Sequence, residues 1–133
     1  MSNLQKATLE TLLARKEQAQ ASKTQFVEVD VPSVGMTFTV ERQPLTRILS
    51  LLDRYKNEST SLVDYLEMYR DLIYNSVPLM RSAKLQEAYA PKIPTDIVTM
   101  VFDENLQAIG ELGDAIAELY GVNNGGAVET VKN

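Results

Sequence analysis

The spacing of apolar residues changes from a helical period to a period of two and back again along this chain. The N-terminal stretch has the spacing of one helix face and predicts an amphipathic helix that ends near Gln20; its apolar positions are Leu4, Leu9, Leu12 and Leu13. From Phe26, apolar and polar residues alternate on both sides of the turn residues 32–35, which predicts a β-hairpin near 26–40. A two-stranded hairpin is barely stable by itself, so we expect it to pack on helices or pair with another chain.

Two longer helices are predicted after the hairpin. Pro44 suits the first turn of a helix, because its missing N–H costs nothing there, and the apolar stripe that follows predicts an end near Asn57. Ser61 has the position of an N-cap for the next helix, which should reach Asn75 or Ser76.

Prolines divide the next part of the chain. The residue before a proline avoids helical geometry, so Val77-Pro78 should interrupt the chain before a short helix around residues 85–89. Pro91 and Pro94 predict an extended connector, and Pro94 or Thr95 opens the next helical segment.

The last predicted helix contains two glycines. The helical period resumes at Asp103 and continues to Tyr120, and Gly121 is placed to end the helix in left-handed geometry. Gly110 and Gly113 each cost about 0.5–1 kcal/mol relative to alanine inside a helix. We expect them to allow the close approach of another helix.

These elements predict a mainly α fold with a small β-hairpin (α+β), arranged as a compact multi-helix domain. A chain of 133 residues with 44% apolar residues can bury one core. We expect a single domain over residues 1–121 and a flexible tail over 122–133, where Gly125-Gly126 interrupts any period.

The acidic residues are concentrated near the C-terminus. Residues 93–133 contain seven acidic residues and one basic residue, Lys132, whereas residues 1–92 contain 11 acidic and 12 basic residues. The acidic run is interpreted as a solvated helix face; the alternative is a docking surface for a basic partner helix. Nucleic acid binding is not expected, because the net charge is −5 and no basic stripe is present.

Catalytic chemistry is weakly represented, and we predict neither an enzyme nor a cofactor site. The chain has no histidine and no Gly-rich phosphate loop. Ser82 and Lys84 lie close enough in sequence to suggest a nucleophile and base, but Ser82 is more simply interpreted as a helix cap.

A metal site is not predicted either. Asp103, Asn105 and Asp114 occupy three ligand positions of a calcium loop, but Ala108 stands at the sixth position, where the sharp turn needs glycine. The helical period explains this segment better.

The composition favours a cytoplasmic protein. Glu10 and Glu17 interrupt the apolar pattern near the N-terminus, which is unlike a signal peptide, and no run approaches the roughly 20 apolar residues of a membrane helix. Cysteine is absent, which excludes disulfides and thiolate sites.

The order of helical pieces between residues 62 and 120 resembles the XkdN-like family of phage tail assembly chaperones. The resemblance rests on Val-Pro-Leu at residues 77–79, Leu-Gln-Glu-Ala-Tyr at 85–89, Pro-Thr-Asp-Ile-Val from Pro94, and the closing Tyr120-Gly121. Residues 1–61 match only in outline, and the matching positions are packing and capping positions.

The resemblance implies a non-catalytic assembly factor. Members of such families bind the tape measure protein, keep it soluble, and help tail tube subunits polymerise around it. The expected partners are therefore the tape measure protein and the tail tube protein, with self-association into a homo-oligomer. The expected location is the host bacterial cytoplasm, with absence from the mature virion.

A partner helix is expected to bury its apolar stripe in a groove whose rim is acidic. The predicted groove-lining residues are Ile97, Met100, Val101, Leu106 and Ile109. Two other functions stay open on the sequence: a structural tail completion or connector subunit, and a small bacterial interaction adaptor.

Overall fold

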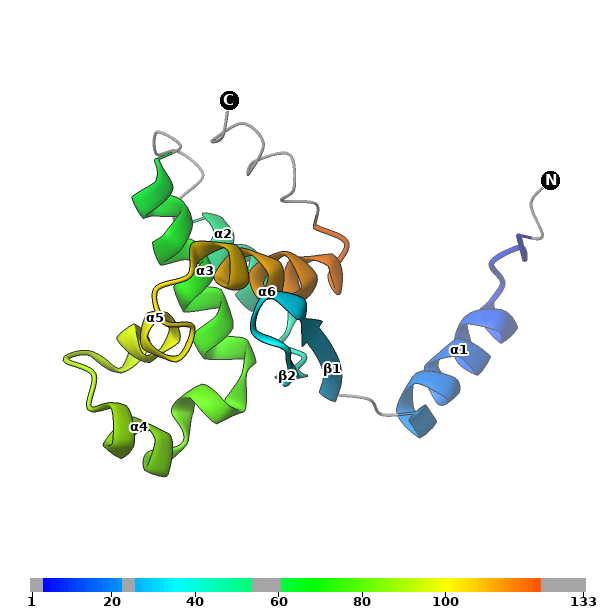
Figure 1. Cartoon of the computed structure of the whole chain (residues 1–133). Helices are drawn as coiled ribbons and strands as arrows, with labels where there is room; N and C mark the ends of the chain where they lie inside the picture. Colours follow the sequence, from blue (N-terminus) through cyan, green and yellow to red (C-terminus); the bar gives the residue numbers. More distant parts are fainter. Residues whose placement is uncertain (1–3, 23–25, 54–60, 123–133) are drawn as a thin grey trace.

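Helices pack against one face of a β-hairpin in this protein, and the predicted mainly α (α+β) fold class is confirmed (Figure 1). The computed structural model describes residues 4–22, 26–53 and 61–122. In chain order the elements are α1 (Leu9–Ser22), β1 (Phe26–Val31), η1 (Pro32–Val34), β2 (Met36–Glu41), α2 (Leu45–Asp53), α3 (Leu62–Ser76), η2 (Pro78–Arg81), α4 (Ala83–Tyr89), η3 (Pro94–Asp96), α5 (Ile97–Val101) and α6 (Leu106–Glu118).

The hairpin has the predicted position and one buried face. β1 and β2 are antiparallel, with Val29 opposite Phe38. Gly35 closes the turn in left-handed geometry (φ 64°), where glycine has no steric cost. On the outer face, Thr37 donates a hydrogen bond of 2.8 Å to the Asp30 carboxylate. The inner face joins the core through Val29, Val31, Phe38 and Val40.

Helices α3 and α6 pack closely because two glycines of α6 lie under two tyrosines of α3. A Cβ on Gly110 would meet the Tyr65 hydroxyl, and a Cβ on Gly113 would meet the Tyr69 ring. The Tyr69 hydroxyl donates a hydrogen bond to the Asp114 carboxylate in the next position of α6. The predicted close approach of a helix at these glycines is confirmed.

Local capping explains where the helices start and end. The side-chain oxygens of Ser61, Ser82 and Asn105 accept hydrogen bonds from backbone N–H groups in the first turns of α3, α4 and α6. Val77 leaves helical geometry before Pro78, and α3 ends there. Gly121 adopts the expected left-handed geometry, with φ 74°, but α6 already ends at Glu118, two residues before the expected end at Tyr120.

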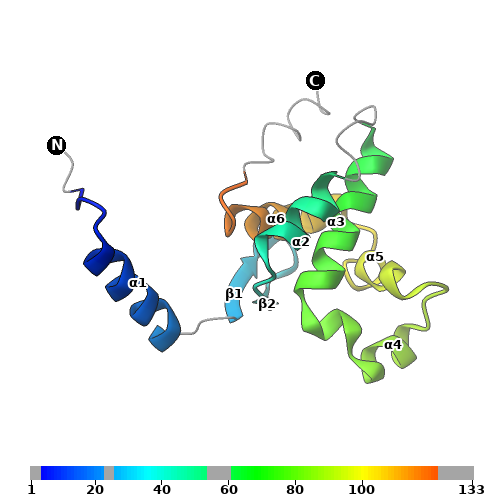
Figure 2. The same cartoon turned by 180° about the vertical axis from the view of Figure 1, so that it is seen from behind.

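The N-terminal helix stands apart from the rest of the protein (Figures 1 and 2). The apolar pattern predicts a helix face that includes Leu4, but α1 starts only at Leu9. The Thr8 hydroxyl caps the helix there, because it accepts a hydrogen bond of 3.2 Å from the Thr11 N–H. Among the described side chains, core contacts begin at Val27, so those of α1 up to Gln18 add nothing to the core that the remaining elements share.

Two expectations reach beyond the described residues. The predicted end of the second helix near Asn57 lies outside them, since α2 is described to Asp53. The predicted tail also lies outside, except for Val122, whose N–H bonds the Ala117 carbonyl at 3.1 Å. Across residues 4–22, 26–53 and 61–122, no helix combines the length and the apolar character that a membrane span requires.

The turn of the hairpin is tied to α6 through one carboxylate. Ser33 donates two hydrogen bonds to Glu111, from its backbone N–H (3.2 Å) and from its hydroxyl (2.5 Å). Both contacts lower the pKa of Glu111 below its ordinary value of 4.5, and the hydroxyl contact has the larger effect.

We expect Ser33→Ala to raise the pKa of Glu111 toward its ordinary value, as followed by an NMR pH titration of the Glu111 side chain. A lowered folded-state pKa means that Glu111 contributes stability above its unfolded-state pKa and loses it as the pH falls through the folded-state pKa. The variant should therefore be less sensitive to acid than the wild type. Thr37→Ala is the control, because it removes the hydrogen bond from Thr37 to the Asp30 carboxylate elsewhere on the hairpin. If Thr37→Ala shifted the pKa of Glu111 as much as Ser33→Ala does, the assignment to Ser33 would be wrong.

Candidate functional site

A groove lies between the first turns of α3, the start of α6 and the turn that leads into it. We call it the α3–α6 groove; its volume is about 410 Å³. Apolar side chains form more than half of its wall, and polar side chains form the rest. The lining residues are Leu62, Val63, Leu66, Arg70, Asp96, Thr99, Glu104, Leu106 and Ile109.

The helix caps set the positions of the apolar wall. Ser61 starts α3, so the first turn places Leu62 and Val63 at the groove, where more than half of each side chain is exposed. Asn105 starts α6 in the same way and brings Leu106 to the opposite wall. When a partner covers apolar side chains that are this exposed, the burial of their surface stabilises the complex.

Charged groups border the groove. The Arg70 guanidinium lies between two carboxylates, 3.6 Å from Asp96 and 3.4 Å from Asp71. Glu104 is exposed, in a two-residue turn in which Asp103 and Glu104 both have positive φ (54° and 59°). Non-glycine residues rarely adopt this geometry, and here the 2.8 Å hydrogen bond from Glu104 N–H to the Thr99 carbonyl holds it.

The structure separates the five predicted contact residues. Leu106 and Ile109 line the α3–α6 groove, although Ile109 is almost fully buried. Ile97 is fully buried in the core, Val101 is partly buried, and Met100 is exposed away from the groove lining. A partner can reach Met100 and Leu106 without disturbing the core, whereas Ile97 is closed off in this conformation.

Three apolar groove residues of α3 were not predicted as contacts. Leu62 and Leu66 belong to the apolar stripe of α3, and this pattern assigns them to the protein's own core. Val63 lies outside that stripe. An apolar residue outside the core-facing stripe of a helix indicates a possible contact surface, and this was the signal in the sequence that could have identified Val63. Its side chain is 63% exposed.

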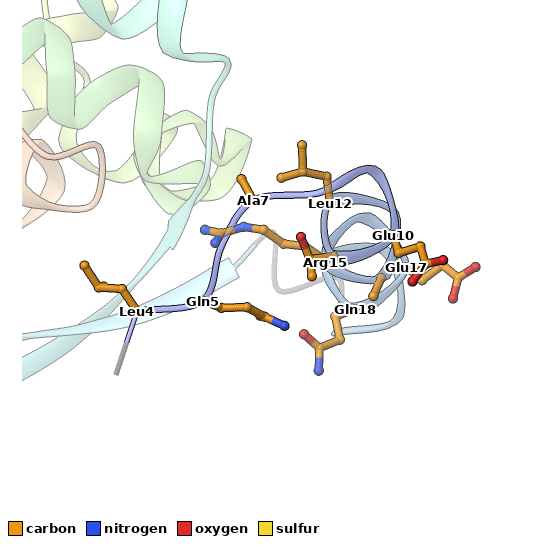
Figure 3. A pocket seen from close by; sticks show the side chains of 10 residues that line it. Leu4, Gln5, Ala7, Glu10, Leu12, Arg15, Glu17 and Gln18 are labelled. Carbon is orange, nitrogen blue, oxygen red and sulfur yellow. The ribbon is translucent and has the colours of Figure 1, made fainter. Parts of the chain in front are cut away.

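A second hollow runs along α1 and the segment before it (Figure 3). Glu10 and Glu17 lie together on one side of the helix, and Leu12 points to another side. The lining residues all belong to α1 and the residues just before it. The hollow is therefore a feature of an uncovered helix and not a cavity of the core.

The polar groups at the centre of the helix pair have structural roles. Burial, with a smaller effect from the Asp114 carboxylate, raises the pKa of Tyr65 from 10.0 to about 12, so this phenol keeps its proton to a higher pH than an ordinary tyrosine does. Ser82 caps α4 through a 3.4 Å hydrogen bond from Leu85 N–H. Within the described ranges, no three His, Cys, Asp or Glu side chains come together as they would to hold a metal ion.

Comparison with known proteins identified no relative of this chain. No protein-family model matches the chain, and no match was found among curated proteins or among solved structures. The function must therefore be argued from the surfaces of the protein and from the motifs in its sequence.

Proposed function

We propose that this protein is a non-catalytic phage tail assembly chaperone that binds the tape measure protein, keeps it soluble and assists assembly of the tail tube. The observation that carries the proposal is the α3–α6 groove, an apolar groove with a charged rim that none of the described residues covers. The XkdN-like pattern of residues 62–120 supplies the identity of the partner. Under this proposal the protein acts in the host cytoplasm and is absent from the finished virion.

The groove suits an amphipathic helix of the client. Leu62, Val63 and Leu106 would cover apolar anchors spaced three and four residues apart on the client helix. Glu104 at the rim would favour a basic residue beside those anchors and thereby select among apolar helices, whereas Asp96 is already paired with Arg70. A long chain rich in such helices aggregates when they are uncovered, so covering them one by one keeps it soluble.

Co-expression with the largest protein encoded just downstream tests this function. We expect the large protein to become soluble and to co-elute with this chain in size-exclusion chromatography with light scattering. If the large protein stays insoluble while this chain elutes alone, the chaperone function is wrong. Retention of the chain in purified particles would instead indicate a structural tail subunit.

A single substitution should separate client binding from folding. We expect Val63→Glu to lower the soluble, co-eluting fraction of the tape measure protein at least tenfold, because it places a carboxylate on the apolar wall of the groove. Leu79→Glu is the matched control, since Leu79 is 57% exposed, similar to Val63, and lies on η2 outside the groove. Equal losses in the two variants would show that the groove has no special role.

A further inference from the structure

Helix α1 carries apolar side chains that nothing in the described chain covers. Leu9, Leu12 and Leu13 are spaced as neighbours on one side of the helix and are 74%, 56% and 51% exposed. We call these three residues the leucine face. Leu4, just before the helix, is exposed as well. A helix with such a face is poorly stable alone in water and gains its stability by packing.

The α3–α6 groove is the complementary surface in the same chain. It offers apolar side chains from two helices, Leu62 and Val63 on one wall and Leu106 on the other. Helices bind such grooves through apolar anchors at positions i, i+3 and i+4, which is the spacing of Leu9, Leu12 and Leu13. With 14 residues, α1 is roughly 21 Å long and can extend along the groove with its leucine face inward.

Basic residues of α1 can pair with an acidic residue at the groove, although Glu17 at position i+4 from Leu13 and Arg70 in the groove add charges of the other sign. Arg15 and Lys16 follow the leucine face at positions i+3 and i+4 from Leu12. Glu104 and Asp96 stand at the groove; Asp96 is paired with Arg70 at 3.6 Å, so the exposed Glu104 is the carboxylate that can receive a basic residue of α1. Opposite charges around an apolar contact favour one partner and one orientation over others.

The connection to β1 disfavours docking of α1 in the groove of its own chain. In both views the start of β1 lies on one side of the body (Figures 1 and 2). The N-terminal turns of α3 and α6, which line the groove, lie on the other side. The four Cα–Cα steps from Ser22 to Phe26 can span only about 14 Å even when fully extended. A second copy can present α1 to the groove without this restriction.

We propose that α1 of one copy of this protein occupies the α3–α6 groove of a second copy. Each copy then donates one helix and accepts one, which is a head-to-tail contact that generates rings or open chains of subunits. The proposal concerns the chain alone and does not depend on the chaperone function. If that function is correct, the neighbouring α1 covers the groove when no client helix does.

Mixing two variants tests the donor and acceptor surfaces separately. Leu12→Glu spoils the leucine face and leaves the groove intact, whereas Val63→Glu spoils the groove and leaves α1 intact. We expect light scattering to show wild-type mass that grows with concentration, and a monomer for either variant alone. The equimolar mixture should give a one-to-one dimer that grows no further, because only one intact helix and one intact groove remain.

The matched controls keep the same added charge on other surfaces. Ala14→Glu lies away from the leucine face of α1, and Leu79→Glu lies outside the groove; both should associate like the wild type. Circular dichroism checks each fold, and Glu104→Lys replaces Val63→Glu in the mixture if the latter loses helical signal. A monomeric wild type, undiminished association of Leu12→Glu, or a mixture that stays monomeric would overturn the proposal. Co-expression with the tape measure protein is a separate measurement, and its failure leaves these results unaffected.

Discussion

Replacing Phe102 with alanine should lower the free energy of unfolding by about 3–5 kcal/mol, the usual cost of removing a buried phenylalanine ring. Phe102 is 1% exposed and follows the last residue of α5. Its ring lies 5.2 Å from the ring of Phe38 on β2, at an interplanar angle of 45°. The substitution therefore leaves a cavity where the hairpin meets the helices, and small domains have only about 5–15 kcal/mol of stability to lose.

The chain offers a control of the same residue type. Phe26 at the start of β1 is 51% exposed and lies outside the core, so Phe26→Ala should change the free energy of unfolding by about 0.5 kcal/mol or less. Urea unfolding followed by circular dichroism measures both variants. Similar small losses for the two phenylalanines would contradict the packing of the hairpin on α5.

The elements that sequence alone predicts are those that local chemistry determines. The hairpin follows from alternation and a turn that contains Gly35, and α3 follows from the Ser61 cap and the break at Pro78. The start of α1 was misplaced because the apolar pattern includes Leu4, whereas the Thr8 cap begins the helix at Leu9. Where the two signals differ by about one turn of helix, the capping residue and not the apolar position determines where the helix starts.

The candidate site was only partly predictable because it depends on contacts between distant segments. An apolar stripe shows which residues avoid water but does not show whether the protein itself or a partner covers them. Ile97 was predicted as a contact residue, yet it is buried in the core. Leu62 and Val63 become groove residues only because α6 packs beside α3, and that pairing joins residues more than 40 positions apart.

The separation of α1 could not be inferred from its pattern. Its leucines have the same helical spacing as those of helices that join the core, so the predicted single domain over residues 1–121 included α1. In the structure the core contacts begin at Val27, and the leucine face is left uncovered. Packing of α1 against the body requires a complementary surface near the start of β1, whereas the first turns of α3 and α6, which line the groove, lie on the opposite side of the body (Figure 1).

Gly113→Ala should lower the free energy of unfolding by about 2 kcal/mol, although alanine is the better helix former. The added Cβ would stand 2.6 Å from Cγ and 2.8 Å from Cε2 of the Tyr69 ring, closer than real contacts allow. Tyr69 cannot easily yield, because its ring is fully buried and its hydroxyl donates a hydrogen bond to Asp114. Overpacking of this kind costs about 1–3 kcal/mol, which exceeds the gain of about 0.5–1 kcal/mol from replacing a helical glycine.

Gly110→Ala is the matched control, because the same substitution in the same helix meets only the tip of a side chain. Its Cβ would approach the Tyr65 hydroxyl at 2.5 Å, while the next ring atom is 3.7 Å away, so a small rotation of Tyr65 relieves the contact. We therefore expect a change of about 1 kcal/mol or less, measured by urea unfolding. In a Tyr69→Leu background the ring is absent, and Gly113→Ala should then cost little or even stabilise the helix. An undiminished loss in that background would mean that the Tyr69 ring is not what requires glycine at position 113.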